Sequence, residues 1–367
     1  MGAGRGSQRK HQGPSGRKTR REDSALRKAL LAWFQTNARP LPWRARQDAY
    51  GVWVSEIMLQ QTQVASVIPF YHRFLQAFPT VQQLAQAPYE DVVRLWSGLG
   101  YYRRARLLHA AARQVTEAWG CRFPASYDEA RTLPGVGHYT ACAVLSIAYD
   151  KPLPVLDGNV ARVMARLNAL PGNLHETNFR QVVERGLARL ISKRSPGAFN
   201  QAMMELGQTV CTAHGPACPA CPIERWCKAR RQGEQEKYPS PKPRRATELR
   251  HLAAAVIRRD GKVALVRGLE ENLLEDLWNF PAAFGGSERD AAERLRTKLA
   301  LLTKSAVLAT EKAGSLQHGI TYRSIQVTLY RVEIKTAGRN GRFRWFGLQE
   351  LQQQAVSQLA RKIAAGI

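Results

Sequence analysis

Apolar residues along this chain follow two different spacings, which divide it into two regions. Between Ala25 and residue 209 they recur every three or four positions, as expected of amphipathic helices. From Leu249 onwards, alternating runs that are typical of strands are mixed with two helical stretches. The pattern therefore predicts a mainly α region followed by an α+β domain on a mostly antiparallel sheet.

The first region is predicted to be a succession of helices joined by short turns. Ser24 is the expected N-cap of the first helix, and Pro40 and Pro42 break the helical pattern after it. The stretch VWVSEIMLQQTQVASVI, residues 52–68, is expected to form one long helix. The other helices are expected over 25–36, 71–77, 80–86, 89–97, 103–118, from about 139, and over 160–170, 176–192 and 198–209.

The second region is expected to open with a hairpin. Within 251–266, Asp260 and Gly261 form the turn between two strands. Further strands are expected over 322–334 and 343–346, and helices over 287–302 and 348–365.

Changes in composition predict where the regions begin and end. Residues 1–21 are rich in Lys and Arg and contain no acidic residue, so a disordered basic arm is expected over 1–22, or equally a frayed terminus. The folded helical region would follow over 23–231. A basic, proline-containing linker is expected over 232–248, and the second domain over 249–367.

The formal net charge of +26 favours a polyanionic partner, nucleic acid before an anionic membrane. No apolar run approaches the roughly 20 residues that cross a bilayer, and the basic N-terminus lacks the apolar segment of a secretory signal. We therefore expect no membrane partner and an intracellular protein, in the cytoplasm or nucleoid of a bacterium or the nucleus of a eukaryote. In such compartments cysteines serve metals or catalysis before disulfides.

One stretch, LPGVGHYTACAVLSIAYDKPLPVLDGNV, combines a glycine turn with two helix starts. Gly135 and Gly137 allow a sharp turn, and free N–H groups at the start of the next helix, near Tyr139, suit an anion such as a phosphate. Asp157 stands where it would cap a second helix. Two interpretations are open. The stretch is either an ordinary turn followed by an ordinary helix N-cap, or a site that binds a nucleic-acid backbone and holds a carboxylate at a fixed distance from it.

The cysteines give a second signal. Four of the six lie in one short proline-containing segment with the spacing C-x6-C-x2-C-x5-C: Cys211, Cys218, Cys221 and Cys227. Four thiolates so close in sequence suit one metal centre, and the spacing alone is compatible with Zn²⁺ or with a [4Fe-4S] cluster.

Five motifs together resemble the helix-hairpin-helix DNA glycosylases that carry an iron–sulfur cluster: LPGVGHYTA, VLDGNV, SEIMLQQTQV, GLGYY and the cysteine segment. Among these enzymes, the chain resembles the adenine DNA glycosylases of the MutY family densely over residues 24–235. The C-terminal region is similar, more loosely, to that family's MutT-like (Nudix-fold) domain. The resemblance implies two helical lobes, a [4Fe-4S] cluster within 211–227, and base-excision repair. The reaction would be hydrolysis of the N-glycosidic bond of adenine opposite 8-oxoguanine or guanine, on double-stranded DNA, by a monomer.

The resemblance also implies roles for individual residues. Glu56 would protonate adenine N7 and Asp157 would stabilise the sugar cation, as two carboxylates share the work in glycoside hydrolysis. Without the resemblance, Glu56 would be interpreted as a surface residue of an amphipathic helix. Tyr139 and Asn159 would orient the reacting groups. The positions implied to contact DNA are Gln61 and Tyr101 as wedges, Thr62 and Leu99 facing 8-oxoguanine, Gly135, Val136 and Gly137 on a phosphate, and Thr321 as a sensor of 8-oxoguanine.

Two other functions compete with this one. Endonuclease III-like pyrimidine-lesion glycosylases are similar in the same motifs, but a lysine follows their hairpin and attacks the sugar. Tyr139 stands there in this chain, and a phenol cannot form an imine. The other alternative is a non-catalytic DNA-binding protein with a structural zinc.

The C-terminal domain departs from an active Nudix hydrolase. In GGSERDAAERLRTKLALL the clustered glutamates that would bind Mg²⁺ are missing, and a hard divalent ion needs several carboxylate oxygens. We therefore expect recognition without nucleotide hydrolysis. Thr321, within HGITYR, offers a hydroxyl where the family usually has Phe-Ser-His, although its neighbours differ from that pattern.

Overall fold

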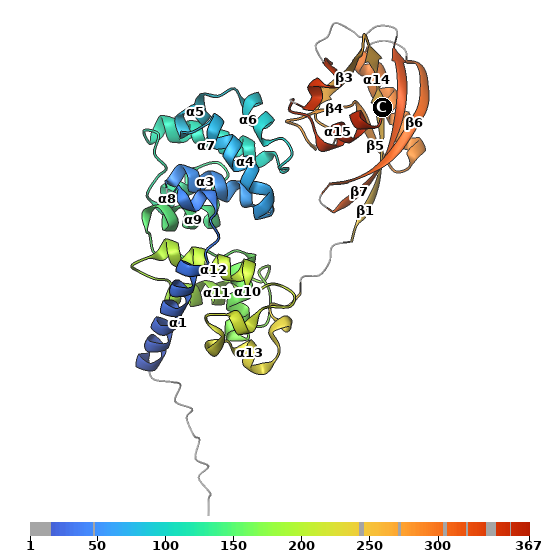
Figure 1. Ribbon diagram of the computed structural model, residues 1–367. Helices are drawn as coiled ribbons and strands as arrows, with labels where there is room; N and C mark the ends of the chain where they lie inside the picture. The colour runs from blue at the N-terminus through green and yellow to red at the C-terminus, as the bar shows by residue number, and fades with distance from the viewer. Residues whose placement is uncertain are drawn as a thin grey trace, which may run out of the picture. The chain divides into compact units, whose positions relative to one another are not determined.

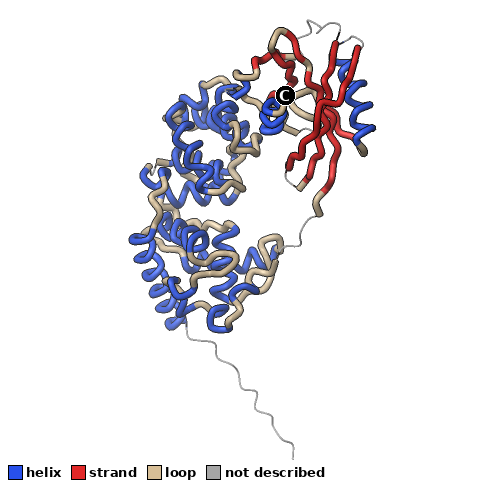
Figure 2. Tube along the Cα trace, turned by 45° about the vertical axis from the view of Figure 1, so that its right-hand side comes forward, coloured by secondary structure: helices blue, strands red, loops and turns tan. Residues whose placement is uncertain are grey.

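The computed structural model describes residues 16–46, 48–241, 246–270, 273–303, 307–320, 322–334, 343–352 and 354–367. Helices form the part up to residue 241, and the strands lie in the part that follows (Figures 1 and 2). The predicted division into a mainly α region and an α+β domain is thereby confirmed. By internal contacts the chain divides into two compact units, Met1–Glu56 with Arg122–Lys242 and Ile57–Cys121 with Pro243–Ile367, which are described in turn.

The first unit is helical. Its elements are α1 (Gly16–Asn37), α2 (Pro42–Ala45), α3 (Ala49–Leu59) as far as Glu56, α8 (Tyr127–Thr132), α9 (His138–Tyr149), α10 (Gly158–Asn168), α11 (Thr177–Leu190), α12 (Pro196–Thr209), η1 (Cys218–Ala220), η2 (Glu224–Trp226), α13 (Lys228–Gln232) and η3 (Gln235–Lys237). Apolar residues at helical spacing on α1, α10, α11 and α12 face one core, which includes Leu30, Met164, Leu187, Phe199 and Leu206.

A buried carboxylate ties the start of this unit to its end. Glu205 of α12 is 1 % exposed and accepts hydrogen bonds from Arg39 Nε at 2.6 Å and Arg44 Nη2 at 2.8 Å. The Arg39 main-chain N–H donates to it as well. Burial alone would raise the pKa of Glu205, but the hydrogen bonds from the two guanidinium groups outweigh it and lower the pKa below its ordinary value.

The first helix begins earlier than the sequence predicted. Because α1 starts at Gly16, the expected disordered arm is wrong for residues 16–22, and Ser24 lies inside the helix instead of capping it. The basic residues of this stretch are good helix formers, so charge alone did not mark the helix boundary. Residues 1–15 lie outside the described part.

The second unit opens with four more helices after the end of α3: α4 (Val64–Ala77), α5 (Val81–Gln86), α6 (Tyr89–Trp96) and α7 (Arg103–Ala118). Phe74 and Trp96 meet edge to face in its core, with ring centroids 5.8 Å apart. The expected single helix over 52–68 is wrong, because the chain leaves the helix after Leu59 and starts again at Val64. Gln61 has a left-handed backbone (φ 58°), which an α-helix cannot contain.

The rest of the second unit is the α+β domain. One sheet has the order β5-β1-β7-β6, and a second contains β2, β3 and β4, with β8 paired to β3. The elements are β1 (Glu248–Val256), β2 (Arg258–Arg259), β3 (Lys262–Arg267), β4 (Trp278–Asn279), β5 (Ala282–Gly285), α14 (Glu288–Thr303), β6 (Val307–Ile320), β7 (Arg323–Ile334), β8 (Arg344–Gly347), η4 (Glu350–Gln352) and α15 (Gln358–Ala365).

Strand β1 lies between β5 and β7 in its sheet, and its residues 252–256 are buried on both faces. Its alternate residues Leu252, Ala254 and Val256 join the core that contains α15. Ala253 and Ala255 join the core that contains α14. The sheet therefore lies between two helical layers.

The predictions for this domain are confirmed in part. Asp260 and Gly261, both with positive φ, form the turn of the β2–β3 hairpin. β1 belongs to the other sheet, however, where it pairs with β7 in parallel, so the first strand of the hairpin expected within 251–266 is divided between β1 and β2. The helix expected over 348–365 is limited to η4 and α15.

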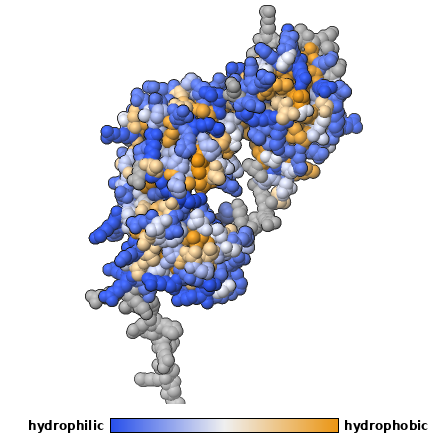
Figure 3. All heavy atoms as spheres, viewed as in Figure 1, coloured by the Kyte–Doolittle hydropathy of each residue, from blue (hydrophilic) through white to orange (hydrophobic). Residues whose placement is uncertain are grey.

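Hydrophilic residues cover most of the surface that Figure 3 presents, with smaller apolar areas between them. In the part of the chain that is described, no helix has both the length and the apolar character needed to cross a membrane.

Candidate active site

The first unit brings two of the predicted catalytic residues into direct contact. Glu56 lies on α3 and is 5 % exposed, and Oε2 accepts a hydrogen bond from the Tyr139 hydroxyl of α9 at 2.9 Å. The same hydroxyl lies 3.6 Å from Met204 Sδ. Burial raises the pKa of Glu56 to about 7; the Tyr139 hydrogen bond opposes this and the negative charge of Asp157 adds to it. This carboxyl group can hold a proton near neutral pH.

The second predicted carboxylate is held at the start of α10. Asp157 caps this helix, with Oδ1 accepting from Val160 N at 2.7 Å and Oδ2 accepting from Asn159 Nδ2 at 2.8 Å. One oxygen is thus held by the main chain and the other by a side chain. The structural role as a cap, which the sequence left as an alternative, is therefore confirmed.

Asn159 is itself fixed by a second layer of contacts. Its Oδ1 accepts from Arg162 Nη2 at 2.9 Å, and the same guanidinium group donates to the carbonyls of Gly207 and Cys211. Helix α12 approaches closely here, because a Cβ placed on Gly207 would stand 2.7 Å from Asn159 Cβ. The side chain that orients Asp157 thus has no freedom to move towards α12.

The glycine turn presents fewer free amides than expected. Val136 N donates to Leu133 O at 3.1 Å within the turn, so the expectation that Val136 holds a phosphate is wrong for its main-chain N–H. The amides of Gly135 and Gly137 make no hydrogen bond among the described residues, and both glycines are exposed. Gly135 has a φ of 76°, which explains the need for glycine. Two exposed amides thus stand at the N-terminus of α9.

The predicted wedge residues lie in two loops of the second unit. Gln61 is exposed in the loop between α3 and α4, and Tyr101 is 44 % exposed in the loop between α6 and α7. Thr62 is half-buried, and its hydroxyl bonds to Gln60 O and to Arg104. Leu99 is 6 % exposed, and its contact with 8-oxoguanine stays a prediction.

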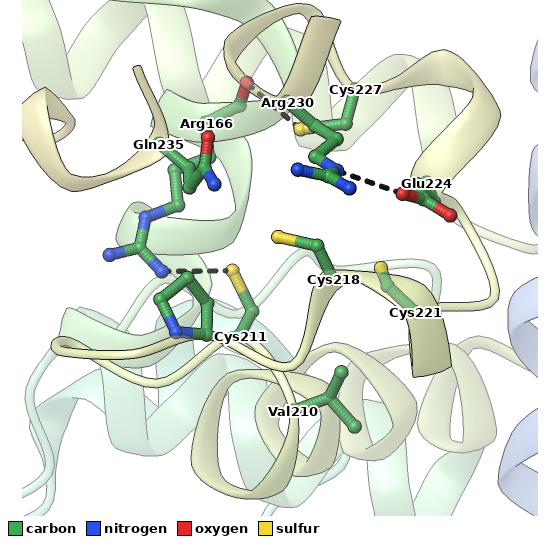
Figure 4. Close-up of a pocket in the computed structure, with 10 residues that line it drawn as sticks. Arg166, Val210, Cys211, Cys218, Cys221, Glu224, Cys227, Arg230 and Gln235 are labelled. Atoms are coloured by element: carbon green, nitrogen blue, oxygen red, sulfur yellow. Dashed lines mark hydrogen bonds and ion pairs between the residues drawn. The ribbon is translucent and has the colours of Figure 1, made fainter. Parts of the chain in front are cut away.

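The four cysteines of the predicted metal segment are unpaired and surround one pocket: Cys211, Cys218, Cys221 and Cys227 (Figure 4). The pocket encloses about 310 Å³ of space not filled by atoms, part of it open to solvent. Arg166, buried beneath it, donates to Cys211 Sγ at 3.4 Å and accepts from Cys227 through its carbonyl. Burial raises the pKa of the Cys221 thiol to about 12. Within the described residues, no three His, Cys, Asp or Glu side chains stand close enough to hold a single metal ion.

In the α+β domain, the carboxylates of the predicted Nudix-like stretch are each bonded to a basic side chain. Glu288 bonds to Lys312, Asp290 to Arg294 and Glu293 to Arg289. Thr321 lies outside the described residues.

Sequence reasoning missed the basic residues that hold these groups in place. Arg104, Arg162 and Arg166 are buried or half-buried, and each donates several bonds to main-chain carbonyls. A pattern of apolar spacing treats an arginine as solvent-facing. Only Arg162, three residues after Asn159 on the same helix face, carried a local signal of its contact.

Known proteins match both halves of the chain. Residues 54–189 match the family described as "HhH-GPD superfamily base excision DNA repair protein", and residues 253–366 match the NUDIX domain. The human adenine DNA glycosylase is 47 % identical over 225 residues, which are 59 % of this chain and 41 % of the human protein. The mouse adenine DNA glycosylase is 33 % identical over 403 residues, covering 93 % of this chain and 77 % of that protein.

Solved structures agree on the fold of the helical part. A thermostable thymine-DNA glycosylase, 24 % identical, matches 58 % of this chain and 99 % of its own with a TM-score of 0.52. The match spans less than half of the length of the human relative. The match to the mouse relative includes nearly all of this chain and more than two thirds of the mouse protein. The chain therefore belongs to the adenine DNA glycosylase family, with a helix-hairpin-helix region and a C-terminal Nudix domain.

Proposed function

We propose that this protein hydrolyses the N-glycosidic bond of adenine mispaired with 8-oxoguanine or guanine in duplex DNA, as a step of base-excision repair. The observation that carries the proposal is the pair of carboxylates in contrasting surroundings. Glu56 is buried with a pKa of about 7, whereas both oxygens of Asp157 are hydrogen-bonded at the start of α10. A buried carboxyl group with a raised pKa suits the role of the acid, and the second, fixed carboxylate suits the role of the anion that faces the sugar.

In the proposed reaction, Glu56 donates its proton to adenine N7 once the base has left the stack. The protonated base departs with the bonding electrons, and the sugar becomes an oxocarbenium ion. The Asp157 carboxylate, held by Val160 N and Asn159, stabilises that cation. Glu56, now ionised, takes a proton from the attacking water, which restores the starting state. The exposed amides of Gly135 and Gly137 would bind a phosphate of the DNA.

The direct test is single-turnover strand scission, with and without hot alkali. Matched duplexes carry adenine opposite 8-oxoguanine, guanine or thymine, or thymine glycol opposite adenine. We expect alkali-dependent breaks at adenine, fastest opposite 8-oxoguanine, because hydrolysis alone leaves an abasic site and Tyr139 cannot form an imine. Alkali-independent breaks at thymine glycol would contradict the proposal and support a lyase.

Replacement of Tyr139 by phenylalanine is expected to move the pH profile of excision upward. Burial raises the pKa of Glu56, and the hydrogen bond from Tyr139 lowers it. Loss of that hydrogen bond should therefore raise the pKa further. The acid form of Glu56 then persists to higher pH, and the fall in single-turnover rate above neutrality begins later. A profile identical to that of the wild type would show that this hydroxyl does not tune the acid.

For the cysteines, we propose that Cys211, Cys218, Cys221 and Cys227 hold a [4Fe-4S] cluster. Two observations support this: the four thiols line one pocket, and none of them is in a disulfide. The choice of a cluster over one Zn²⁺ rests on the family resemblance of the C-x6-C-x2-C-x5-C segment. Such a group would supply four iron–thiolate bonds that cross-link the segment.

We expect Cys221→Ser to lose iron and the brown colour of the purified protein, while Cys121→Ser, outside the segment, keeps both. Iron and acid-labile sulfide analysis with visible absorption spectra would measure the difference. Colourless wild-type protein with one zinc per chain would contradict the cluster.

We propose that the C-terminal domain recognises 8-oxoguanine and does not hydrolyse nucleotides. The stretch GGSERDAAERLRTKLALL supports the second part, because it lacks the clustered glutamates and a hard divalent ion needs several carboxylate oxygens. Thr321 remains the predicted sensor on sequence grounds alone.

A further inference from the structure

Arg104, near the start of α7, is a buried cation without a carboxylate partner. It is 8 % exposed, and no ion pair reaches it from any described residue. Burial lowers its pKa to about 10. A guanidinium group held in such a place needs other compensation, because an uncompensated buried charge is strongly destabilising.

That compensation comes from the main chain of the two loops that carry the predicted wedge residues. Nη1 donates to the carbonyls of Ile57 (2.9 Å), Met58 (2.8 Å) and Gln60 (2.5 Å). The first two belong to the last turn of α3, whose carbonyls have no partner within the helix and carry the negative end of its dipole. One side of the guanidinium group thus caps the C-terminal carbonyls of α3 and bonds to the loop that follows.

The other side of the group bonds to the second loop and to Thr62 of the first. Nη2 donates to Thr62 Oγ1 (3.2 Å), Leu99 O (3.5 Å) and Gly100 O (3.2 Å). The guanidinium carbon also lies 5.3 Å from the centre of the Tyr101 ring, within the range of a cation–π contact. A single side chain therefore connects residues 57–62 with residues 99–101.

In both loops, Arg104 bonds to the main chain next to a residue with a strained backbone. Gln61 and Tyr101 have positive φ angles of 58° and 48°, which non-glycine residues seldom adopt. In each loop, the carbonyl directly before the strained residue, that of Gln60 or Gly100, is bonded to Arg104. Such strain persists only where the surroundings impose it.

We propose that Arg104 is a positioning residue that holds Gln61 and Tyr101 at the fixed spacing needed to displace a base from the DNA stack. This inference rests on the proposed function, and it extends it from the chemistry of the bond to the opening of the duplex. Arg104 itself touches neither the base nor the reacting atoms. It acts through the main chain of the two loops.

The test compares Arg104→Lys and Arg104→Gln with Arg103→Gln in the full-length protein. Arg103 is the exposed neighbour on the same helix, so its loss removes a charge and leaves the loops intact. Base extrusion is followed by the fluorescence of 2-aminopurine in place of the target adenine, in a Glu56→Gln background that does not cleave. Single-turnover excision is measured in the otherwise wild-type background. Melting curves show which variants are folded.

We expect both Arg104 variants to lose about 10- to 100-fold in excision of a paired adenine, with a matching loss of the extrusion signal, since hydrogen bonds to a charged group are lost. Arg103→Gln is expected to stay within about threefold. On a duplex whose target base is already unpaired opposite an abasic site, the Arg104 variants should recover, because little unstacking remains.

Three outcomes would overturn the proposal: an extrusion signal unchanged in the variants, an equal loss on paired and unpaired targets, or unfolding of both variants at the assay temperature. The last would mean that Arg104 holds the whole helical lobe. If the wild type excised no adenine at all, the proposed function would fail, and the extrusion signal would still decide the role of Arg104.

Discussion

Glu56→Gln is expected to stop excision of adenine while the protein still binds the mispaired duplex. Glutamine keeps the size of the side chain and can still accept the Tyr139 hydrogen bond, but it cannot transfer a proton to the base. Loss of a general acid costs about 10²- to 10⁴-fold, and more where the same group later serves as the base. Single-turnover excision and a binding titration on the same duplex measure the two effects separately.

The pH dependence of the wild-type rate gives an independent check on the same carboxyl group. The reaction needs the protonated form of Glu56, whose pKa is about 7. The rate should therefore be level below neutrality and fall about tenfold per pH unit well above it. Near-normal turnover of Glu56→Gln, or a rate that stays level to high pH, would remove Glu56 from the role of acid.

Glu205→Gln is expected to have the largest effect on stability. The carboxylate is almost fully buried and bonds two guanidinium groups, so its neutralisation leaves Arg39 and Arg44 without their counter-charge. Removing one partner of a buried ion pair costs about 3–5 kcal/mol, and the partial exposure of Arg39 places the effect near the lower end. Chemical denaturation followed by helical circular dichroism would measure the loss in the free energy of unfolding.

Glu234→Ala is the matched control, because Glu234 pairs with Lys237 on the exposed surface of the same unit. Such pairs contribute at most about 1 kcal/mol. The pKa of Glu205 is lowered in the folded state, so the stability it contributes is present above the unfolded pKa of about 4.3 and is lost as the pH falls through the lower folded value. A loss for Glu205→Gln no larger than that of the control would contradict the prediction.

Sequence patterns predicted the elements whose apolar residues face a core. Helices α5, α6, α7, α10, α11 and α12 lie within a few residues of their expected positions, because a repeated apolar spacing is set by burial along the whole element. The boundary between the helical region and the sheet was also visible in composition. Of the predicted site residues, Glu56 contacts Tyr139 and Asp157 contacts Asn159, and their catalytic roles stay predictions.

The failures occur where a distant contact overrides the local pattern. Residues 52–68 keep a helical spacing, yet the helix ends at Leu59, and the carbonyl of Gln60 bonds to Arg104, more than forty residues later. Val136 was expected to offer its amide to a phosphate, but the turn itself uses that amide. The parallel pairing of β1 with β7 joins strands on either side of α14, and nothing local to either strand marks that pairing.

The cap that Asp157 forms on α10 has a consequence for how reactants meet. One oxygen of the carboxylate is bonded to the main chain and the other to Asn159, whose position Arg162 and Gly207 fix in turn. A side chain anchored in this way keeps its position and does not rotate towards a sugar. In the proposed reaction the nucleotide therefore has to move to the carboxylate, and the distance between the sugar and Asp157 depends on how far the DNA bends and the nucleotide rotates.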